Sequence, residues 1–315
     1  MYFPYLYGKA AELLALRELA SDLGTPQLIW PVIEPTKPFQ QLKTTLQALK
    51  LQSSGADVVV NPNKGDLDTA AAVHAWRTGL AAEVADPSLV RPTFLSSGLT
   101  GAGDLVGFVG DFPGRPIGVV MTSNDISPGD VAAAIAGTTH TIFLGMHANR
   151  LAYVSALGAG VTVDLEDNFV PQARNADYSG SDTQGTNHLT WVMQGKVGFG
   201  DFTVLPATYS DSAGPMGALA IHLTYETPTE LRLQHFISTT ASQTAPLAPK
   251  FAEAIAVMRR QIATTPSRFR TSPATTAYVA MHTAGVYTSA CRWGYRNPRS
   301  ANKAARNRAA TNTHT

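Results

Sequence analysis

Short runs of apolar, often β-branched residues recur through the first two thirds of the chain, and stretches with apolar residues at helical spacing separate most of them. Such runs predict buried strands, and their alternation with helices predicts an α/β fold. Eight runs lie at residues 2–7, 28–33, 57–60, 93–95, 117–121, 141–144, 161–163 and 202–205. This number of strand and helix units matches a (β/α)8 TIM-like barrel. A doubly wound open sheet would show the same alternation.

Glycine and proline refine the predicted elements. Helical spacing predicts a helix over residues 9–23, and Gly24 should end it. Pro31 lies inside the second apolar run, where proline removes a donor from the strand ladder, so we expect a bulge there. Residues 67–84 predict one alanine-rich helix, whereas the Gly-Ala-Gly sequence at residues 101–103 predicts a turn.

The chain changes character after the eighth run. Residues 216–225 and 231–239 alternate between apolar and polar positions, and the polar segment between them predicts a β-hairpin. Residues 246–264 predict a helix whose apolar stripe needs a partner surface, and another helix should follow Pro273. The expected domains are a barrel over residues 1–206, a hairpin with helices packed on it over 207–295, and a disordered basic tail over 296–315.

Composition limits what the chain can do. Hydrophobic residues make up 44% and charged residues 15% of its 315 residues, which indicates a globular protein and excludes disorder as the main state. The net charge of +1 gives no overall attraction to nucleic acid or to a membrane surface. Residues 296–315 hold five cations without an acid or a large apolar residue, so we expect a solvated tail rather than a nucleic-acid contact.

Signals for export and insertion are missing from the sequence. The N-terminus lacks a basic segment followed by an apolar stretch, and no run reaches about 18 apolar residues. The single cysteine, Cys291, cannot form an internal disulfide and is more typical of a small buried residue than of a reactive thiol. We therefore expect a cytoplasmic protein that does not bind membranes. The sequence contains no P-loop, H-E-x-x-H or G-x-S-x-G motif.

Polar residues follow the ends of the predicted strands. In a barrel and in an open sheet alike, ligands bind where parallel strands end at their carboxyl side. We expect a site for a polar or phosphorylated small molecule at this rim, although mixed charges also suit a hydrated surface. The rim residues are Lys9, Glu34, Lys37, Asn61, Lys64, Asn124, Asp125, Asp164, Glu166 and Asp167.

Three acids, Asp164, Glu166 and Asp167, follow the seventh run directly and repel one another unless a cation lies near. Side chains alternate faces along a strand, so Asp164 and Glu166 should point the same way. Two carboxylates on one side suit Mg²⁺ or Mn²⁺, or an acid/base pair. We predict that the three acids form the centre of a ligand site with Glu34 and Lys64. A solvated loop is the alternative.

Asp201 and two histidines are further candidates. Asp201 lies between a glycine and a phenylalanine at the start of the eighth run, where it could serve catalysis or accept a structural hydrogen bond. His222 and His235 lie on the predicted hairpin without the spacing of a metal site, and such histidines are more often structural than ligands. Asp167 could pair with Arg174.

A set of short motifs spreads over the chain from its first residue to about residue 295. They are residues 1–9 with 12–18, Val60-Asn61-Pro62, Asp167, Arg174-Asn175-Ala176-Asp177-Tyr178, Gly200-Asp201-Phe202, residues 220–225 and His235-Phe236. Together they resemble motifs of the bacterial and phage proteins called the beta family. The resemblance implies a role in prokaryotic antiviral defence, often beside a nuclease-like partner protein.

Rim and motifs together define the candidate residues. The catalytic candidates are Asp164, Glu166, Glu34, Lys64 and Asp201, with Asp164 and Glu166 also as metal ligands. The ligand-binding candidates are Lys9, Asn61, Asp167, Arg174, Asn175, Asp177, Tyr178, His222 and His235. We expect a barrel protein with a metal- or phosphate-binding rim that acts in anti-phage defence. The alternative is a non-catalytic recognition or scaffold subunit that works with a nuclease-like partner.

Overall fold

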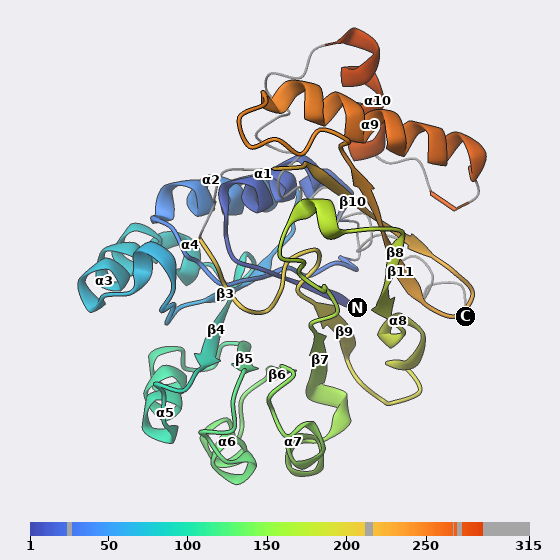
Figure 1. Ribbon diagram of the computed structural model, residues 1–315. Coiled ribbons are helices and arrows are strands. Elements are labelled where there is room, and N and C mark those ends of the chain that lie inside the picture. Colours follow the sequence, from blue (N-terminus) through green and yellow to red (C-terminus); the bar gives the residue numbers. More distant parts are fainter. Residues whose placement is uncertain (24–26, 212–216, 267, 270–272, 286–315) are drawn as a thin grey trace. The chain divides into compact units, whose positions relative to one another are not determined.

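Eight parallel strands close into a barrel in the computed structural model, which describes residues 1–23, 27–211, 217–266, 268–269 and 273–285. The strands pair in chain order, except that β9 lies between β7 and β1 and closes the ring (Figure 1). The predicted TIM-like barrel is therefore confirmed, and the open sheet is excluded. The barrel strands are β1 (Tyr2–Leu6), β2 (Val32–Ile33), β3 (Ala56–Val59), β4 (Val90–Ser96), β5 (Ile117–Met121), β6 (His140–Leu144), β7 (Thr162–Glu166) and β9 (Gly198–Asp201).

Helices follow most of these strands and form the outer layer of the barrel. On the outer side of β5 and β6, Ile117, Val119 and Ile142 belong to one buried cluster with Phe108 and Val131 from the helices. Burial of each such side chain stabilises the fold by roughly 1.5–3 kcal/mol. The α-helices of this layer are α1 (Ala10–Leu19), α2 (Phe39–Leu51), α3 (Ala70–Gly79), α4 (Ala81–Ala85), α5 (Ala102–Asp111), α6 (Pro128–Ala134), α7 (Arg150–Leu157) and α8 (Asn187–Thr190).

The inner side of the barrel holds aromatic and charged residues. Asp57 on β3 is fully buried and accepts two hydrogen bonds from Arg91 on β4, one from Nε at 2.5 Å and one from Nη2 at 2.6 Å. Thr93 donates a further bond to Asp57 at 2.9 Å. The Arg91 guanidinium lies 6.0 Å from the ring centroid of Phe143, whose ring contacts that of Phe3. This buried ion pair thus has the additional hydrogen bonds that such a pair requires.

The eighth barrel strand is β9, so its prediction at residues 202–205 is wrong by four residues. Two glycines conceal the strand in the sequence, because they lack the branched side chains typical of strands. Both glycines are needed for the close approach of β1. A Cβ atom at Gly198 would lie 2.3 Å from the carbonyl oxygen of Met1, and one at Gly200 would lie 2.6 Å from that of Phe3.

Pro31 interrupts the second apolar run instead of producing a bulge within a longer strand. β2 begins only after the proline, and Ile29 forms an isolated bridge to Tyr2. Although Pro31 has no N–H to donate, its carbonyl oxygen accepts a hydrogen bond from the Asp57 amide at 2.9 Å. The proline therefore keeps one link to β3 while it shortens the strand.

Two helix predictions also differ from the structure. The single helix expected over residues 67–84 divides into the 3-10 turn η2 (Gly65–Leu67), α3 and α4. The expected turn at residues 101–103 instead begins α5, because the Asp104 side chain accepts a hydrogen bond from the Gly101 amide at 2.8 Å and caps the helix. The remaining 3-10 turns are η1 (Ala20–Asp22), η3 (Ala159–Val161) and η4 (Asn175–Asp177).

The described residues group into two compact units. The first contains Met1–Asp167 and Asn187–Phe202, and the second contains Asn168–Thr186 and residues from Thr203 onward. An antiparallel sheet with the strand order β10, β11, β8 forms the second unit together with two helices. These elements are β8 (Ser181–Gly185), β10 (Ala220–Glu226), β11 (Leu231–Ile237), α9 (Leu247–Thr264) and α10 (Pro273–Ala284). Packing of the hairpin on the barrel stays a prediction.

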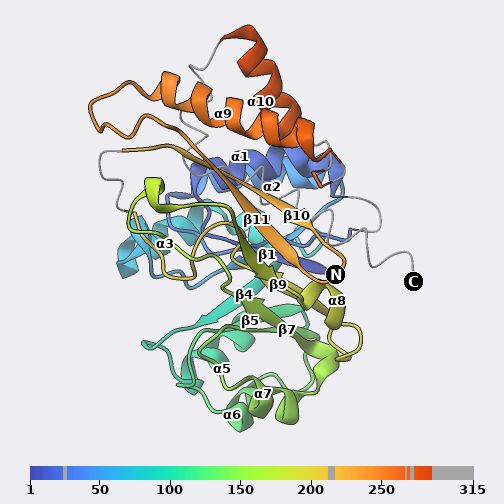
Figure 2. The same cartoon turned by 45° about the vertical axis from the view of Figure 1, so that its right-hand side comes forward.

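The second unit confirms the predicted hairpin and long helix. β10 and β11 pair in register from Ala220 with Ile237 to Glu226 with Leu231, and α9 lies beside them (Figure 2). Phe251 from the stripe of α9 is fully buried in one cluster with residues of both strands. The sequence of β8, Ser-Asp-Thr-Gln-Gly, has no apolar residue and therefore gives no strand signal. Pairing with β11 at the edge of the sheet holds it as a strand.

Some predictions lie outside the described residues: the helix end at Gly24, the start of the hairpin at Met216, Cys291 and the basic tail over residues 296–315. Within the described part of the chain, none of the helices combines the length and the apolar character needed to span a membrane.

Candidate functional site

A buried carboxylate lies at the carboxyl end of β2. Glu34 follows this strand directly and is fully buried. Its Oε2 accepts hydrogen bonds from the Tyr5 hydroxyl at 2.7 Å and from the Lys64 ammonium at 2.9 Å. Its Oε1 is buried as well and has no hydrogen-bond partner among the described residues. One oxygen of the Glu34 carboxylate therefore has hydrogen-bond donors among the described residues, and the other oxygen has none.

Register explains why Glu34 faces the inside of the barrel. Tyr5 pairs with Val32, and Glu34 follows Val32 by two positions, so the three side chains lie on one face of the wall. Phe3 shares that face of β1, and its ring contacts Phe143 inside the barrel. The sequence therefore places Glu34 at the inner rim, where a barrel binds its ligands.

Lys64 and three aromatic rings surround the carboxylate. The Lys64 side chain is 28% exposed, and its ammonium lies 5.2 Å from the ring centroid of Tyr7. The ring of Phe202 lies 4.8 Å from that of Tyr5 and 6.3 Å from that of Tyr7, measured between centroids. Burial raises the pKa of Tyr5 well above its usual range, and the negative charge of Glu34 raises it further. Tyr5 thus remains a protonated donor to Glu34.

Other predicted rim residues take part in hydrogen bonds or ion pairs with residues near them. Asn61 donates to the carbonyl of Leu95 at 2.9 Å and accepts from its amide at 2.8 Å, which joins the ends of β3 and β4. Lys9 is the N-cap of α1, and its amide donates to Glu12 at 2.9 Å. Asn124 accepts from the Asn149 amide, Asp125 accepts from the Ser123 hydroxyl, and Lys37 forms an exposed ion pair with Asp66.

Asp164 and Glu166 do point the same way, as the alternation along β7 predicts. Arg150 from α7 lies 2.6 Å from Glu166 and 3.9 Å from Asp164, measured from Nη1 to the carboxylate oxygens. Lys196 also pairs with Asp164, and Asn187 donates to Glu166 at 3.0 Å. The positive charges of Arg150 and Lys196 therefore balance the negative charges of Asp164 and Glu166.

Asp164 and Glu166 lie on the outer face of the barrel wall, whereas Glu34 and Lys64 meet at its inner face. Val163 and Leu165 alternate with the acids on β7, and Leu165 faces inward, because its Cδ2 would meet a Cβ at Gly200 beside Phe3. Asp164 pairs instead with Phe199, whose ring contacts that of Trp191 in the outer layer. In the described part of the chain, no hydrogen bond or ion pair joins Asp164 or Glu166 to Glu34 or Lys64. The structure does not form the single predicted centre.

The acid pair on β7 is a poor fit for a divalent cation. Arg150 and Lys196 already neutralise the pair, and Arg150 would have to release Glu166 before a metal could take its place. The described residues contain no group of three or more His, Cys, Asp or Glu side chains placed to hold a metal ion. Mg²⁺ or Mn²⁺ at this position stays a prediction that these contacts do not favour.

Asp201 lies at the end of β9 rather than at the start of a strand. Its side chain is nearly buried, and Oδ1 accepts a hydrogen bond from the Tyr2 hydroxyl at 2.6 Å. Tyr2 belongs to β1, so this bond joins the first and last strands of the barrel. The contact favours the structural alternative, in which Asp201 helps to close the barrel.

The second unit holds the remaining predicted ligand-binding residues except Asp167, which is the last residue of a segment of the first unit. Arg174 is 78% exposed and pairs with Asp177 at 2.6 Å, and not as expected with Asp167. Asn175 donates to the carbonyl of Ala218 at 3.0 Å. These three residues of the motif at 174–178 thus stabilise their own turn, η4, and the loop beside it.

Tyr178, His222 and His235 do come together, and Asp182 completes the group. Asp182 lies 3.0 Å from Nε2 of His235, and the Nδ1 atoms of His235 and His222 are 2.7 Å apart. The Tyr178 ring stacks on His235 with its centroid 4.9 Å away. Burial lowers the pKa of His222 to about 3, with a smaller effect from His235. Burial also lowers the pKa of His235, although Asp182 opposes this.

Sequence reasoning missed several members of these groups. Tyr5 lies in the aromatic opening segment, and its alternation with Phe3 could have indicated an inward side chain. Asp182 lies in a polar stretch without strand signal, so no pattern pointed to it. Arg150 and Lys196 come from a helix and a loop that meet β7 only in the folded chain.

No protein-family model matches the sequence, and no curated protein matches it. The resemblance to the beta family and the defence role that it implies therefore stay predictions.

Proposed function

We propose that this barrel binds a small polar ligand beside the ion pair of Glu34 and Lys64, at the carboxyl ends of β2 and β3. The observation that carries the proposal is Oε1 of Glu34, which is buried without a hydrogen-bond partner among the described residues. An unsatisfied buried polar atom costs about 1–3 kcal/mol, and more when the group is charged. A donor from a bound ligand would remove this cost at Glu34.

The surrounding groups define the chemistry of the ligand. Oε1 of Glu34 requires a donor such as a hydroxyl or an ammonium group. The side chain of Lys64 is partly exposed, and its ammonium has further donors that can bind a phosphate or another acceptor while it keeps its bond to Glu34. Tyr7 and Phe202 supply apolar ring surface beside these two groups. A phosphorylated polyol or sugar carries both a hydroxyl donor and an anionic acceptor, and it is the ligand class that we propose.

Native mass spectrometry of protein purified from its own host tests this proposal. We expect a small molecule to remain bound to the unmodified chain and to be lost from Lys64→Met. Loss of a charge-assisted bond of about 1.5–3 kcal/mol lowers affinity roughly ten- to a hundredfold. Lys37→Met is the matched control, because Lys37 pairs with exposed Asp66 at a distance of 3.1 Å. Equal retention of the molecule by Lys64→Met and Lys37→Met would contradict the proposed site.

The resemblance to the beta family supports a place for this ligand site in anti-phage defence. In a host that depends on the protein for protection, Lys64→Met should then restore phage plating, whereas Lys37→Met should not. If a folded Lys64→Met variant still gave full protection against phage, the ligand site would not be needed for defence.

A non-catalytic recognition subunit is the second candidate. The observation in its favour is that Asp164 and Glu166 are engaged by Arg150, Lys196 and Asn187, so this acid pair serves the structure rather than a reaction. Copurification of a nuclease-like protein from the host, in an amount equal to this chain, would support the candidate. Purification of the chain without any partner would count against it.

A further inference from the structure

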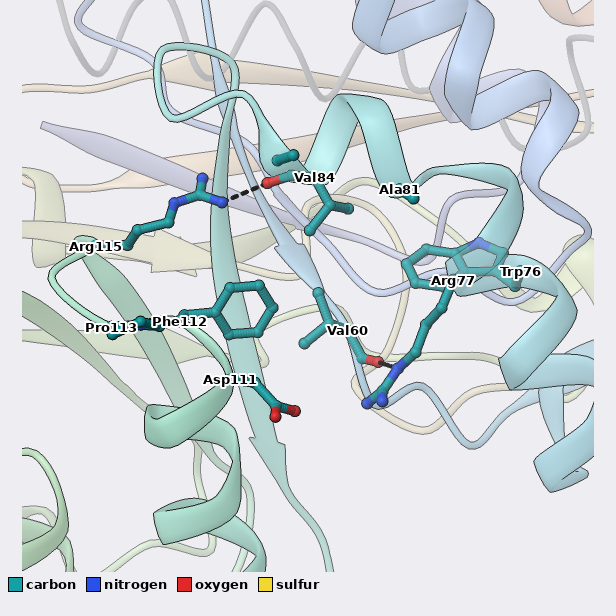
Figure 3. A pocket seen from close by; sticks show the side chains of 10 residues that line it. Val60, Trp76, Arg77, Ala81, Val84, Asp111, Phe112, Pro113 and Arg115 are labelled. Carbon is teal, nitrogen blue, oxygen red and sulfur yellow. Dashed lines mark hydrogen bonds between the residues drawn. The ribbon is translucent and has the colours of Figure 1, made fainter.

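A cavity of about 410 Å³ lies on the outer side of the barrel, between α3, α4 and the segment that joins α5 to β5 (Figure 3). This volume is within the range of small-molecule sites, roughly 300–1,000 Å³. Val60, Trp76, Val84 and Phe112 form most of its apolar wall. In Figure 3, Phe112 and Trp76 lie on either side of Val60 and Val84. The cavity can therefore hold an apolar body of moderate size.

Arg77 brings a positive charge to this cavity without a carboxylate partner. Its Nε donates to the carbonyl oxygen of Val60 at 2.7 Å, which fixes the guanidinium at the wall. The two terminal nitrogens have no partner among the residues that the structure describes. A guanidinium held in this way presents two parallel donors, the geometry that suits a carboxylate.

Two of the lining residues also carry buried donors that are unsatisfied. Nε1 of Trp76 and Nε of Arg115 have no hydrogen-bond partner within the described residues. The terminal nitrogens of Arg115 donate to the carbonyls of Val84 at 2.5 Å and Val90 at 2.6 Å, so this cation forms no ion pair among the described residues, although the charge of Asp86 acts on it. Burial lowers the pKa of Arg115 from its usual value. The terminal nitrogens of Arg77 are thus the open charged donors at this cavity among the described residues.

We propose that this cavity binds an organic carboxylate with an apolar, ring-like body. Arg77, Arg115 and Asp111 are the charged lining residues, and two arginines with one aspartate leave one net positive charge. This charge matches a monoanion, and Asp111 would repel the second charge of a phosphate monoester. The body of the ligand would lie against Val60, Val84 and Phe112, with its carboxylate at the terminal nitrogens of Arg77.

The cavity is separate from the proposed site at Glu34. Val60 belongs to the buried cluster outside the barrel, together with Phe94 and Phe108, whereas Glu34 contacts Tyr5 on the inner face. A carboxylate could therefore bind here whether or not a polar ligand occupies the barrel rim, and the two proposals can fail independently.

Three related probes test the cavity: 2-naphthoate, its neutral match 2-naphthamide, and the dianionic 2-naphthyl phosphate. Binding is followed by the indole N–H resonance of Trp76 in an NMR titration of the full chain, with the resonance assigned by Trp76→Phe. We expect 2-naphthoate to shift this resonance and to bind at least about tenfold more tightly than 2-naphthamide or 2-naphthyl phosphate.

Variants at exposed positions keep the test independent of folding. Arg77→Met should weaken 2-naphthoate about tenfold or more and remove its advantage over 2-naphthamide, while Arg260→Met, at an exposed position of α9, should change neither. Ala81→Trp, which fills the cavity from an exposed position, should abolish binding of 2-naphthoate. Equal affinities for the three probes, or unchanged binding by Arg77→Met, would overturn the proposal. Stronger binding of 2-naphthyl phosphate would overturn the choice of a carboxylate.

Discussion

Replacing Asp57 with asparagine would remove one half of the ion pair inside the barrel and leave Arg91, with a side chain only 18% exposed, without its carboxylate. Breaking a buried pair in this way costs about 3–5 kcal/mol. We predict that urea unfolding shows a loss of this size for Asp57→Asn. Asp66→Asn is the control, since its pair with Lys37 is exposed and worth less than about 1 kcal/mol. Similar stability of the two variants would show that the inner pair does not hold the barrel.

The histidine pair of the second unit should make stability depend on pH. The pKa of His222 falls from 6.5 to about 3 on folding, so the folded chain binds this proton less tightly than the unfolded chain. Its contribution is complete above pH 6.5 and is lost as the pH falls toward 3, and His235 acts in the same direction. Between pH 7 and pH 5 we expect a loss of about 1–2 kcal/mol from His222.

Chemical unfolding at a series of pH values measures this loss. His222→Asn keeps a side-chain donor near Nδ1 of His235 but cannot titrate, so its stability should fall less between pH 7 and pH 5. His74→Asn, at an exposed position on α3, should follow the unmodified chain. An equally steep curve for His222→Asn would mean that the pair does not carry the pH dependence.

The sequence could predict some site residues and not others, for a physical reason. Glu34 and Lys64 follow parallel strands, and the ends of such strands converge, so their meeting at 2.9 Å follows from the fold. The partners of Asp164 could not be predicted, because Arg150 and Lys196 reach it from a helix and a loop outside the barrel wall. The face of the barrel wall on which a side chain lies depends on the pairing register of its strand, and the sequence shows this register only indirectly.

Among the elements, β9 depends on glycine for its place beside β1. A Cβ at position 198 would lie 2.3 Å from the backbone oxygen of Met1, which cannot move without opening the pairing of the two strands. We predict that Gly198→Ala destabilises the protein by about 1–3 kcal/mol, as overpacking does. Gly107→Ala is the matched control. Nothing lies within 4 Å of a Cβ at this exposed position of α5, and alanine should stabilise the helix by up to about 1 kcal/mol.

Thermal unfolding of the two alanine variants gives this comparison directly. Equal melting temperatures for them would mean that β1 and β9 approach less closely than the register indicates.

The lack of side chains on glycine also explains which elements could not be predicted from the sequence. Branched apolar runs predicted β3, β5 and β6, whereas the Gly-Phe-Gly-Asp sequence of β9 and the glycine-rich α5 carry weak propensities and are held by packing and by a cap.

For the whole molecule, the separation of Asp164 and Glu166 from Glu34 and Lys64 has a testable consequence. The double variant Asp164→Asn with Glu166→Gln leaves Arg150 and Lys196 without carboxylate partners, so we expect lower stability. Ligand retention at Glu34 and Lys64 should nevertheless be unchanged, because these residues lie on the other face of the barrel wall. Thermal unfolding combined with native mass spectrometry measures both properties. Loss of the ligand from a folded double variant would instead support a single centre.

The central claim is that Glu34 and Lys64 hold a polar ligand, and a crystal structure of the chain purified from its host tests it most directly. The measurement is the electron density around Oε1 of Glu34. We predict a small molecule with a donor about 2.6–3.2 Å from Oε1 and an acceptor at the ammonium of Lys64. Density for ordered water alone at this oxygen, in protein that remains active in its host, would contradict the claim.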